Sequence, residues 1–257
     1  MPIAPSAEPF YAAGDATGVL VLHGFTGAPA SVRPWGERLA REGRTVLVPR
    51  LPGHGTRWQE LNKTRWTDWY AEASRSLDRL RAECDEVFVC GLSMGGCLAL
   101  RLAEERGDDV AGLVLVNPSV IDTSRALLAV PVLKRLVGSV KGITDDIKKP
   151  GSVEYGYDRL PLRALDSLRA LWQTTRDDLA KVRAPLLVFR SADDHVVAPL
   201  STQTVMHGVS SPDATEQVLH DSYHVATLDY DAETIFSGTA DFVRVHSGRA
   251  AELGADR

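Results

Sequence analysis

The chain has 257 residues, of which 44% are hydrophobic and 25% are charged, and its formal net charge is −5. This composition is typical of a globular protein and excludes a disordered or fibrous chain, and α/β folds often use this length for one domain. Nucleic-acid-binding proteins usually carry a basic excess, so we expect no nucleic acid as a partner. The apolar stretches are far shorter than the roughly 20 residues that cross a bilayer.

The N-terminal segment and the cysteines indicate the cellular compartment of the protein. Residues 1–15 contain neither a basic segment nor a long apolar one, so we expect no signal peptide. The three cysteines, Cys84, Cys90 and Cys97, are an odd and sparse set, which fits a reducing compartment better than a disulfide framework. We therefore expect a cytoplasmic protein. No Cys/His cluster has the spacing of a zinc site, so we expect no metal.

Short apolar runs alternate with segments of helical periodicity, beginning at residue 18. The first helix has Ser31 as its expected N-cap and Gly43 as its expected stop. The run at 110–116 is apolar throughout, as a central parallel strand buried on both faces should be. The expected strands cover residues 18–22, 45–48, 86–90, 110–116, 185–189 and 215–219. The expected helices cover residues 31–42, 66–84, 94–106, 160–180, 201–209 and 231–245.

The alternation stops after the fourth strand. Residues 119–182 contain no good strand, and we interpret them as a helical cap inserted into an α/β core made of residues 1–118 and 183–257. The alternation elsewhere predicts a mostly parallel central sheet with helices on both faces. Active sites in such sheets lie at the carboxyl ends of the strands.

The segment Gly91–Gly95 has the pattern G-x-S-x-G between an expected strand and an expected helix. This is the context of a nucleophile elbow, in which glycines leave room for a sharp turn that exposes the serine. The helix N-terminus behind Ser93 favours a developing oxyanion. The alternative is a glycine-rich turn with an incidental serine, but the placement of the strand and helix favours Ser93 as a nucleophile.

A serine nucleophile needs a base, and the base needs an orienting acid, which in this fold follow in the order Ser, Asp, His. Asp193 and Asp194 both follow the strand at 185–189. We favour Asp194, because in hydrolases of this fold the acid directly precedes a short segment like that at 195–197. Asp193 is the alternative, and we expect it to be a solvated loop residue.

Seven histidines are candidates for the base. His224 follows the last expected strand and precedes the last expected helix, where the base of such a site should lie. His195 belongs to the same loop as the acid, and we interpret it as a loop residue. His220 ends the last strand and is the one serious rival, so we expect His224 to be the base.

An oxyanion hole needs two backbone N–H groups. The N–H of Met94, next to the nucleophile, is one candidate. The loop His23–Gly27 follows the first expected strand, and its glycines allow the backbone to approach a substrate closely, so the N–H of Phe25 is the second candidate. We expect His23 itself to hold this loop by side-chain hydrogen bonds.

With these motifs the chain resembles the α/β-hydrolase superfamily and, more narrowly, the bacterial monoacylglycerol lipases and the small thermophilic carboxylesterases. The resemblance covers nearly the whole chain, and its last segment is long and unusual, which makes it far more specific than G-x-S-x-G alone. It implies the α/β-hydrolase fold, with a triad at Ser93, Asp194 and His224 and oxyanion donors at Phe25 and Met94. The segments that carry it are HGFTG at 23–27, LPGHGT at 51–56, GLSMGG at 91–96, DDHVVAP at 193–199 and SYHVATLDYD at 222–231.

The resemblance also implies two substrate-binding residues in the cap. The segment IKKPGSVEYGY at 147–157 is similar to a family segment whose glutamate holds the glycerol hydroxyls, which places that glutamate at Glu154. A cap isoleucine that contacts the substrate corresponds to Ile143. The alternative for Glu154 is a solvated acid on the surface of the cap.

The apolar stretch earlier in the cap has three alternative uses: it lines an acyl tunnel, forms a membrane-facing lip, or packs the cap on the core. Basic residues among or near it suit transient contact with an anionic lipid surface or form a solvated basic face. The apolar residues are Leu127, Leu128, Val130, Val132, Leu133, Leu136 and Val137, and the basic residues are Lys134, Arg135, Lys141, Lys148 and Lys149.

We therefore expect a serine hydrolase that cleaves monoacylglycerols to glycerol and a fatty acid through an acyl-enzyme. We expect no metal and no organic cofactor, and a monomer or weak homo-oligomer. The alternative enzyme is a carboxylesterase of broad short-chain specificity. A non-catalytic member of the fold is a further alternative, and the combination of triad and oxyanion loop argues against it.

Overall fold

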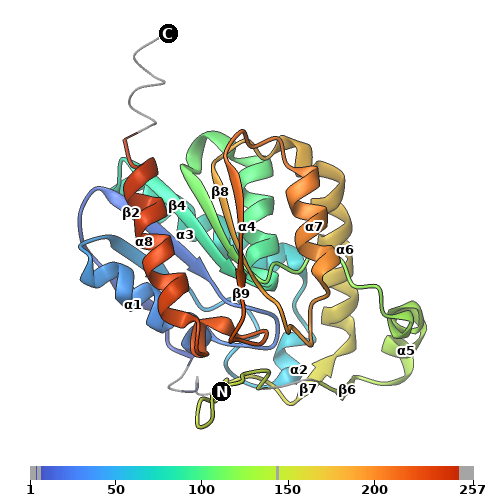
Figure 1. Ribbon diagram of the computed structural model, residues 1–257. Coiled ribbons are helices and arrows are strands. Elements are labelled where there is room, and N and C mark those ends of the chain that lie inside the picture. The colour runs from blue at the N-terminus through green and yellow to red at the C-terminus, as the bar shows by residue number, and fades with distance from the viewer. Residues whose placement is uncertain (1–3, 5–6, 143–144, 249–257) are drawn as a thin grey trace.

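The computed structural model describes residue 4 and residues 7–142 and 145–248. A seven-stranded sheet forms its centre, with the strand order β1-β3-β2-β4-β5-β8-β9 (Figure 1). β1 is antiparallel to β3, and the other neighbouring pairs are parallel. The strands of this sheet are β1 (Phe10–Ala12), β2 (Thr17–Leu22), β3 (Thr45–Val48), β4 (Glu86–Leu92), β5 (Gly112–Val116), β8 (Leu186–Ser191) and β9 (Ala214–Leu219).

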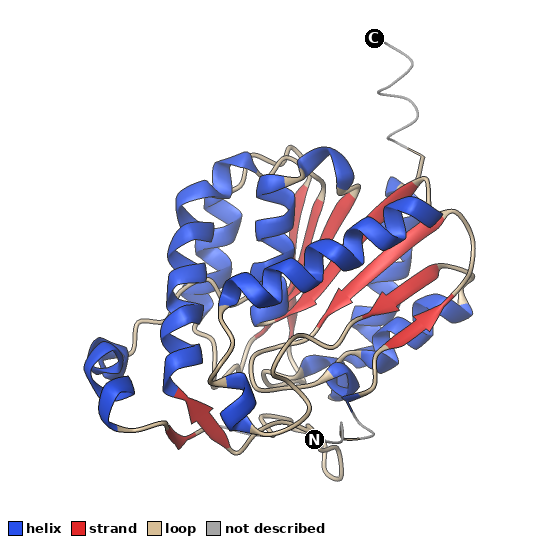
Figure 2. Ribbon diagram, turned by 180° about the vertical axis from the view of Figure 1, so that it is seen from behind, coloured by secondary structure: helices blue, strands red, loops and turns tan. Residues whose placement is uncertain are grey.

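Helices cover both faces of the sheet (Figures 1 and 2). Side chains of a strand alternate between the two faces, so each face buries its own apolar cluster. Leu20 and Leu22 pack with α3, α4, α6 and α7, whereas Val19 and Val21 pack with α1 and α8. The helices are α1 (Arg33–Arg41), α2 (Trp58–Leu61), α3 (Trp66–Glu83), α4 (Met94–Glu105), α5 (Val130–Leu136), α6 (Leu162–Asp178), α7 (Pro199–Gly208) and α8 (Ala232–His246).

All six strands predicted from the sequence are present, with ends that differ by at most two residues. β5 is buried along its whole length, as its apolar composition predicted. β1 was not predicted, because three residues are too few to show alternation. The prediction that Ser31 caps the first helix is wrong: α1 begins at Arg33, and Oγ of Ser31 instead donates to the carbonyl oxygen of Ala28 at 2.8 Å in the preceding turn.

Residues 119–182 connect β5 to β8. They include a second, antiparallel sheet made of β6 (Ser139–Lys141) and β7 (Arg159–Pro161), so the prediction that this region holds no strand is wrong. The two strands have three residues each and are largely exposed, which leaves no hydrophobic pattern to detect. Within the same connection, α6 packs on α4 of the sheet-covering layer. The division into core and cap remains a prediction.

The register of the central strands aligns their carboxyl ends. Leu22 of β2 pairs with Gly91 of β4, and Val116 of β5 pairs with Leu92 of β4 and Phe189 of β8. The loops that follow these strands therefore leave the same edge of the sheet side by side. The polar side chains at this edge come from those loops and from the connection between β5 and β8.

Candidate active site

Ser93 lies in a sharp turn between β4 and α4. Its backbone has φ 55° and ψ −116°, a conformation that residues with a side chain rarely adopt. The turn requires glycine on both sides. A Cβ on Gly91 would lie 2.3 Å from the backbone of Gly95, and a Cβ on Gly95 would lie 2.1 Å from the carbonyl oxygen of Leu22. The glycines of the motif thus have a steric cause, and the turn presents Ser93 to a cavity.

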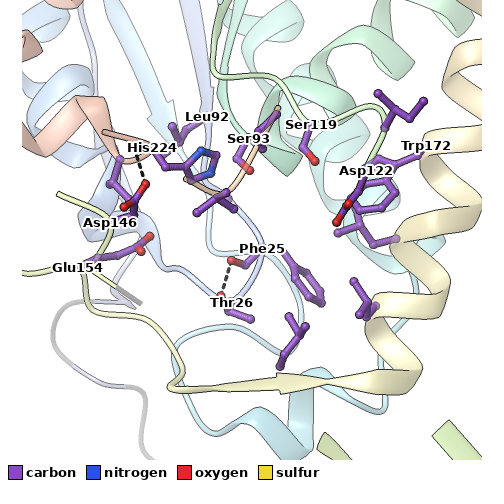
Figure 3. Close-up of a pocket in the computed structure, with 18 of the residues that line it drawn as sticks. Phe25, Thr26, Leu92, Ser93, Ser119, Asp122, Asp146, Glu154, Trp172 and His224 are labelled. Carbon is purple, nitrogen blue, oxygen red and sulfur yellow. Dashed lines mark hydrogen bonds between the residues drawn. The ribbon is translucent and has the colours of Figure 1, made fainter. Parts of the chain in front are cut away.

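His224 and Asp194 form a hydrogen-bonded pair, and Figure 3 shows the ring of His224 beside Ser93. Nδ1 of His224 lies 2.8 Å from Oδ2 of Asp194. The other carboxylate oxygen accepts the N–H groups of Val196 and Val197, each at 2.8 Å. The side chains of His224 and Asp194 are only 9% and 3% exposed. An Nδ1–H that donates to a carboxylate leaves Nε2 as the proton acceptor of the ring.

The charges around His224 raise its pKa. Burial by itself disfavours the imidazolium, but the negative charge of Asp194 and its hydrogen bond, together with the charges of Glu154 and Asp146, outweigh that effect. Burial likewise disfavours the Asp194 carboxylate, yet the charge and hydrogen bond of His224 lower the pKa of Asp194. The pair therefore suits an imidazole that gains a proton during a reaction.

Two residues that the sequence analysis missed hold the backbone of His224. Asn117, directly after β5, donates from Nδ2 to the carbonyl oxygen of His224 at 2.8 Å. Asp146, between β6 and β7, accepts the N–H of His224 at 3.0 Å. Asn117 has φ 45°, which asparagine adopts more readily than most residues, so an asparagine directly after a buried strand was an available signal. Asp146 gave no comparable signal, because its partner lies 78 residues later.

The structure separates the predicted acid and base from their rivals. Asp193 and His220 are exposed, and neither lines the cavity. The side chain of His195 is 56% exposed and bonds to a carboxylate of the β6–β7 connection. The geometry thus brings the predicted nucleophile, acid and base together. Their catalytic roles remain predictions.

The predicted oxyanion donors have unpaired N–H groups. Within the part of the chain that the structure describes, no acceptor takes the N–H of Phe25 or Met94. His23 holds the loop of Phe25 as predicted: Nε2 accepts the N–H of Leu51 at 3.2 Å, and Nδ1 lies 3.0 Å from the carbonyl oxygen of Gly24. Burial lowers the pKa of His23 to about 4, so this ring stays neutral near pH 7.

The cavity beside Ser93 has a volume of about 210 Å³. Figure 3 shows Asp146 and Glu154 on the His224 side of Ser93 and Trp172 on the opposite side. Apart from Ser119 and Asp122, the cavity-lining residues of the β5–β8 connection on the side of Trp172 are apolar. They are Ile121, Leu127, Leu160, Leu165, Leu168 and Trp172. A nucleophile between a polar end and an apolar end suits an ester with one polar and one apolar group.

Glu154 reaches the polar end from the connection between β6 and β7. Its backbone N–H donates to Oδ1 of Asp145 at 2.6 Å, and its carboxylate accepts no hydrogen bond from the described residues. Burial raises the pKa of Glu154 to about 7; the charge of His224 opposes this rise, and the charges of Asp145 and Asp146 support it. The carboxyl group is therefore available to a ligand. Ile143, the other predicted substrate contact, lies outside the described residues.

The apolar residues of the predicted cap lie in different environments. Leu127 lines the cavity, and Val130 is buried. The remaining five side chains are exposed: Leu128, Val132, Leu133, Leu136 and Val137. Among the basic residues nearby, Lys134 pairs with Asp166, while Arg135 is exposed.

Residues 4, 7–142 and 145–248 contain no group of three or more His, Cys, Asp or Glu side chains placed to hold a metal ion. Over those same ranges, no helix combines the length and apolar character that a membrane span requires. The three cysteines are buried and unpaired.

The chain is similar to known hydrolases over most of its length. Residues 15–231 match the family described as "Serine aminopeptidase, S33". A thermostable monoacylglycerol lipase from Bacillus sp. (strain H-257) is 39% identical over 247 residues, which cover 96% of this chain and 98% of that protein. A carboxylesterase from Bacillus subtilis (strain 168) is 27% identical over 244 residues, which cover 92% of this chain and 96% of that protein.

Solved structures show the same fold. One described as "LipS and LipT, two metagenome-derived lipolytic enzymes" has a TM-score of 0.93 at 37% identity, covering 95% of this chain and all of that chain. The monoacylglycerol lipase of Paleococcus ferrophilus has a TM-score of 0.79 at 18% identity, covering 96% of this chain, and at that identity the likeness concerns the fold alone. The predicted α/β-hydrolase fold is therefore confirmed.

Proposed function

The chain belongs to the serine aminopeptidase S33 family of α/β-hydrolases, and from this premise we propose that it is a serine hydrolase that cleaves monoacylglycerols to glycerol and a fatty acid. The family description names a peptidase, but the two relatives described above are a monoacylglycerol lipase and a carboxylesterase, which supports ester hydrolysis. The observation that carries the proposal is the placement of Ser93 between the His224–Asp194 pair, an unpaired Glu154 carboxyl and an apolar pocket.

The reaction begins when Nε2 of His224 takes the hydroxyl proton of Ser93 and Oγ attacks the ester carbonyl. The N–H groups of Phe25 and Met94 donate to the oxyanion of the tetrahedral intermediate. Asp194 holds the ring and stabilises its charged form. His224 then gives the proton to the glycerol oxygen, which leaves. Water attacks the acyl-enzyme with His224 again as the base, and the fatty acid is released.

Glu154 binds the glycerol headgroup in this proposal. Its carboxyl group lies at the polar end of the cavity and has no partner among the described residues, so two adjacent hydroxyls can donate to it. Hydrogen bonds to a charged acceptor contribute about 1.5–3 kcal/mol each, and desolvation reduces this gain. The acyl chain occupies the opposite, apolar end.

A pair of substrates tests the role of Glu154. Glu154→Ala should lower kcat/KM for a monoacylglycerol roughly 10- to 100-fold, which is about 1.4–2.7 kcal/mol, and leave the p-nitrophenyl ester of the same acyl chain nearly unchanged. Asp158→Asn is the matched control, because Asp158 is an exposed carboxylate in the same connection. Equal losses on both substrates would mean that Glu154 supports the fold rather than binding glycerol. No loss on either substrate would mean that Glu154 does not bind the headgroup.

The alternative function, a short-chain carboxylesterase, is favoured by the likeness to the carboxylesterase from Bacillus subtilis. Turnover of a long-chain monoacylglycerol should exceed that of p-nitrophenyl butyrate, because the cavity combines the Glu154 carboxyl with an apolar end. A preference for the butyrate would favour the alternative.

We also propose transient contact with a lipid surface at α5 and the turn that precedes it. Leu128, Val132 and Leu136 are 76%, 64% and 78% exposed, and Arg135 lies among them. An exposed apolar face with basic neighbours suits an anionic bilayer. Cosedimentation with phosphatidylglycerol vesicles should exceed that with phosphatidylcholine vesicles, and Leu136→Ser should weaken it. The cytoplasmic location remains a prediction, supported by the three unpaired cysteines.

A further inference from the structure

The backbone at His224 is held from outside the sheet. The N–H of His224 donates to Oδ2 of Asp146 at 3.0 Å, and the N–H of Val225 donates to the main-chain oxygen of Asp146 at 3.1 Å. Asp146 belongs to the connection between β6 and β7, on the same stretch as Glu154. One residue of this connection therefore fixes two successive amides at the proposed base.

The side chain of Asp146 is itself firmly placed. It is 11% exposed, and its other oxygen, Oδ1, lies 2.7 Å from Nδ1 of His195. On the far side of the base, Asn117 holds the carbonyl oxygen of His224 at 2.8 Å. The two backbone groups of His224 are thus held by two side chains, one from the end of β5 and one from the β6–β7 connection, rather than by a strand or helix.

We propose that Asp146 is a positioning residue for catalysis, which aligns the imidazole of His224 with Ser93 only while the β6–β7 connection is docked on the strand ends. The inference rests on the proposed function, because it assigns His224 the role of base. Proton transfer depends steeply on alignment, and a misplacement of about 1 Å can cost 10²-fold in rate. Docking of the β6–β7 connection, which carries Glu154, therefore also aligns His224.

The charge of Asp146 gives this role a signature besides rate. Three carboxylates face His224: Asp194 from the loop after β8, and Glu154 and Asp146 from the β6–β7 connection, and each of them raises its pKa. His195 lies on the other side of Asp146 and carries the compensating charge when it is protonated. Removing the charge of Asp146 should therefore lower the pKa of His224 and move the acid limb of the kcat/KM profile to lower pH.

The test uses Asp146→Ala and Asp146→Asn on the full chain, with a monoacylglycerol and a p-nitrophenyl ester of the same acyl chain. Asp146→Ala should lower kcat roughly 10- to 100-fold on both substrates with little change in KM, since the base is misaligned for either ester. Asp146→Asn keeps an oxygen that can accept the N–H of His224, so it should recover most of kcat. Both variants should shift the acid limb to lower pH.

Asp122→Asn is the charge control, because Asp122 lines the same cavity and accepts the N–H of Ser124 rather than that of His224. Its acid limb should stay in place. Full kcat in Asp146→Ala, or an unmoved limb in both Asp146 variants, would overturn the proposal. If Asp146→Ala does not fold, the position of the acid limb in the kcat/KM profile of Asp146→Asn tests the proposal instead. Substantial activity in Ser93→Ala would instead overturn the proposed function, whatever the Asp146 variants show.

Discussion

The two sides of the cavity are held in place by different kinds of bond. Ser93 and Asp194 follow β4 and β8, whose backbones are fixed by the hydrogen-bond ladders of the parallel sheet. Glu154 and Asp146 lie on a connection held to the rest of the molecule by separate hydrogen bonds. Asp146 accepts the N–H groups of His224 and Val225 at 3.0 and 3.1 Å. The sheet side therefore depends on many cooperative bonds and the other side on a few separate ones.

A second anchor of the β6–β7 connection illustrates this difference. The buried carboxylate of Asp229 accepts the N–H groups of Lys148 and Lys149 at 2.6 and 2.9 Å, and that of Tyr223 at 3.0 Å. Single substitutions on this side can move the headgroup site without disturbing the sheet. We expect changes on the sheet side to affect all esters and changes at the Glu154 carboxyl on the connection side to affect selectivity; Asp146 acts through His224, so its loss affects all esters.

The largest effect should come from the sheet side. Ser93→Ala removes the nucleophile and should lower kcat about 10⁶-fold on every ester, because loss of a triad nucleophile has that cost. Circular dichroism and the melting temperature should stay close to those of the wild type. If Ser93→Ala retained a tenth of the wild-type activity, Ser93 would not be the nucleophile.

The second-largest loss of kcat should come from replacing the acid, Asp194. Asp194→Asn should lower kcat about 10⁴-fold, because the amide cannot support the imidazolium and favours the wrong tautomer. Asp193→Asn changes an exposed neighbour and should have little effect. Rates of both variants on one p-nitrophenyl ester give the ranking. The reverse order would move the acid to Asp193.

A smaller and selective effect should come from the contact between the two sides. A Cβ on Gly27, in the loop after β2, would lie 2.9 Å from Oε1 of Glu154. Gly27→Ala should displace that carboxylate and lower kcat/KM for a monoacylglycerol by roughly 3- to 10-fold, with the matching p-nitrophenyl ester unaffected. Gly107→Ala, where a Cβ meets nothing within 4 Å, is the control. Parallel losses on both esters would mean that the loop of Phe25 had moved.

The smallest effect concerns stability. Folding raises the pKa of Glu154 from 4.5 to about 7, mainly through burial. Stability that the neutral form provides is therefore present below pH 4.5 and is lost as the pH rises through 7. Glu154→Gln cannot ionise, so its melting temperature relative to the wild type should be higher at pH 8 than at pH 5, by a few degrees. A difference that does not change with pH would contradict this cause.

The difference between the sheet side and the connection side also explains which features the sequence could predict. The run at 110–116 and the pattern around Ser93 carry local signals, because burial on both faces and a sharp turn each demand particular residues. Glu154 was found only through resemblance, since a single carboxylate in a loop has no period. Asp146 was missed because a hydrogen bond from a side chain to a distant backbone group leaves no mark on spacing or composition. Asn117 was missed although an asparagine directly after a buried strand was an available signal. β6 and β7 were missed because they have three residues each.

One consequence of α6 concerns how this enzyme could have diversified. α6 lines the apolar end of the cavity through Leu165 and Leu168, and it also packs on α4, where Asp178 pairs with Arg101 at 2.7 Å. The helix that lines the proposed acyl end of the cavity is thus also the crossover that returns the polypeptide to β8. Exchange of the whole segment 119–182 between relatives would replace the packing of α6 on α4 and the Arg101–Asp178 pair. Grafting of residues 123–158 alone would leave that crossover intact, so changes of specificity should accumulate there by insertion and replacement.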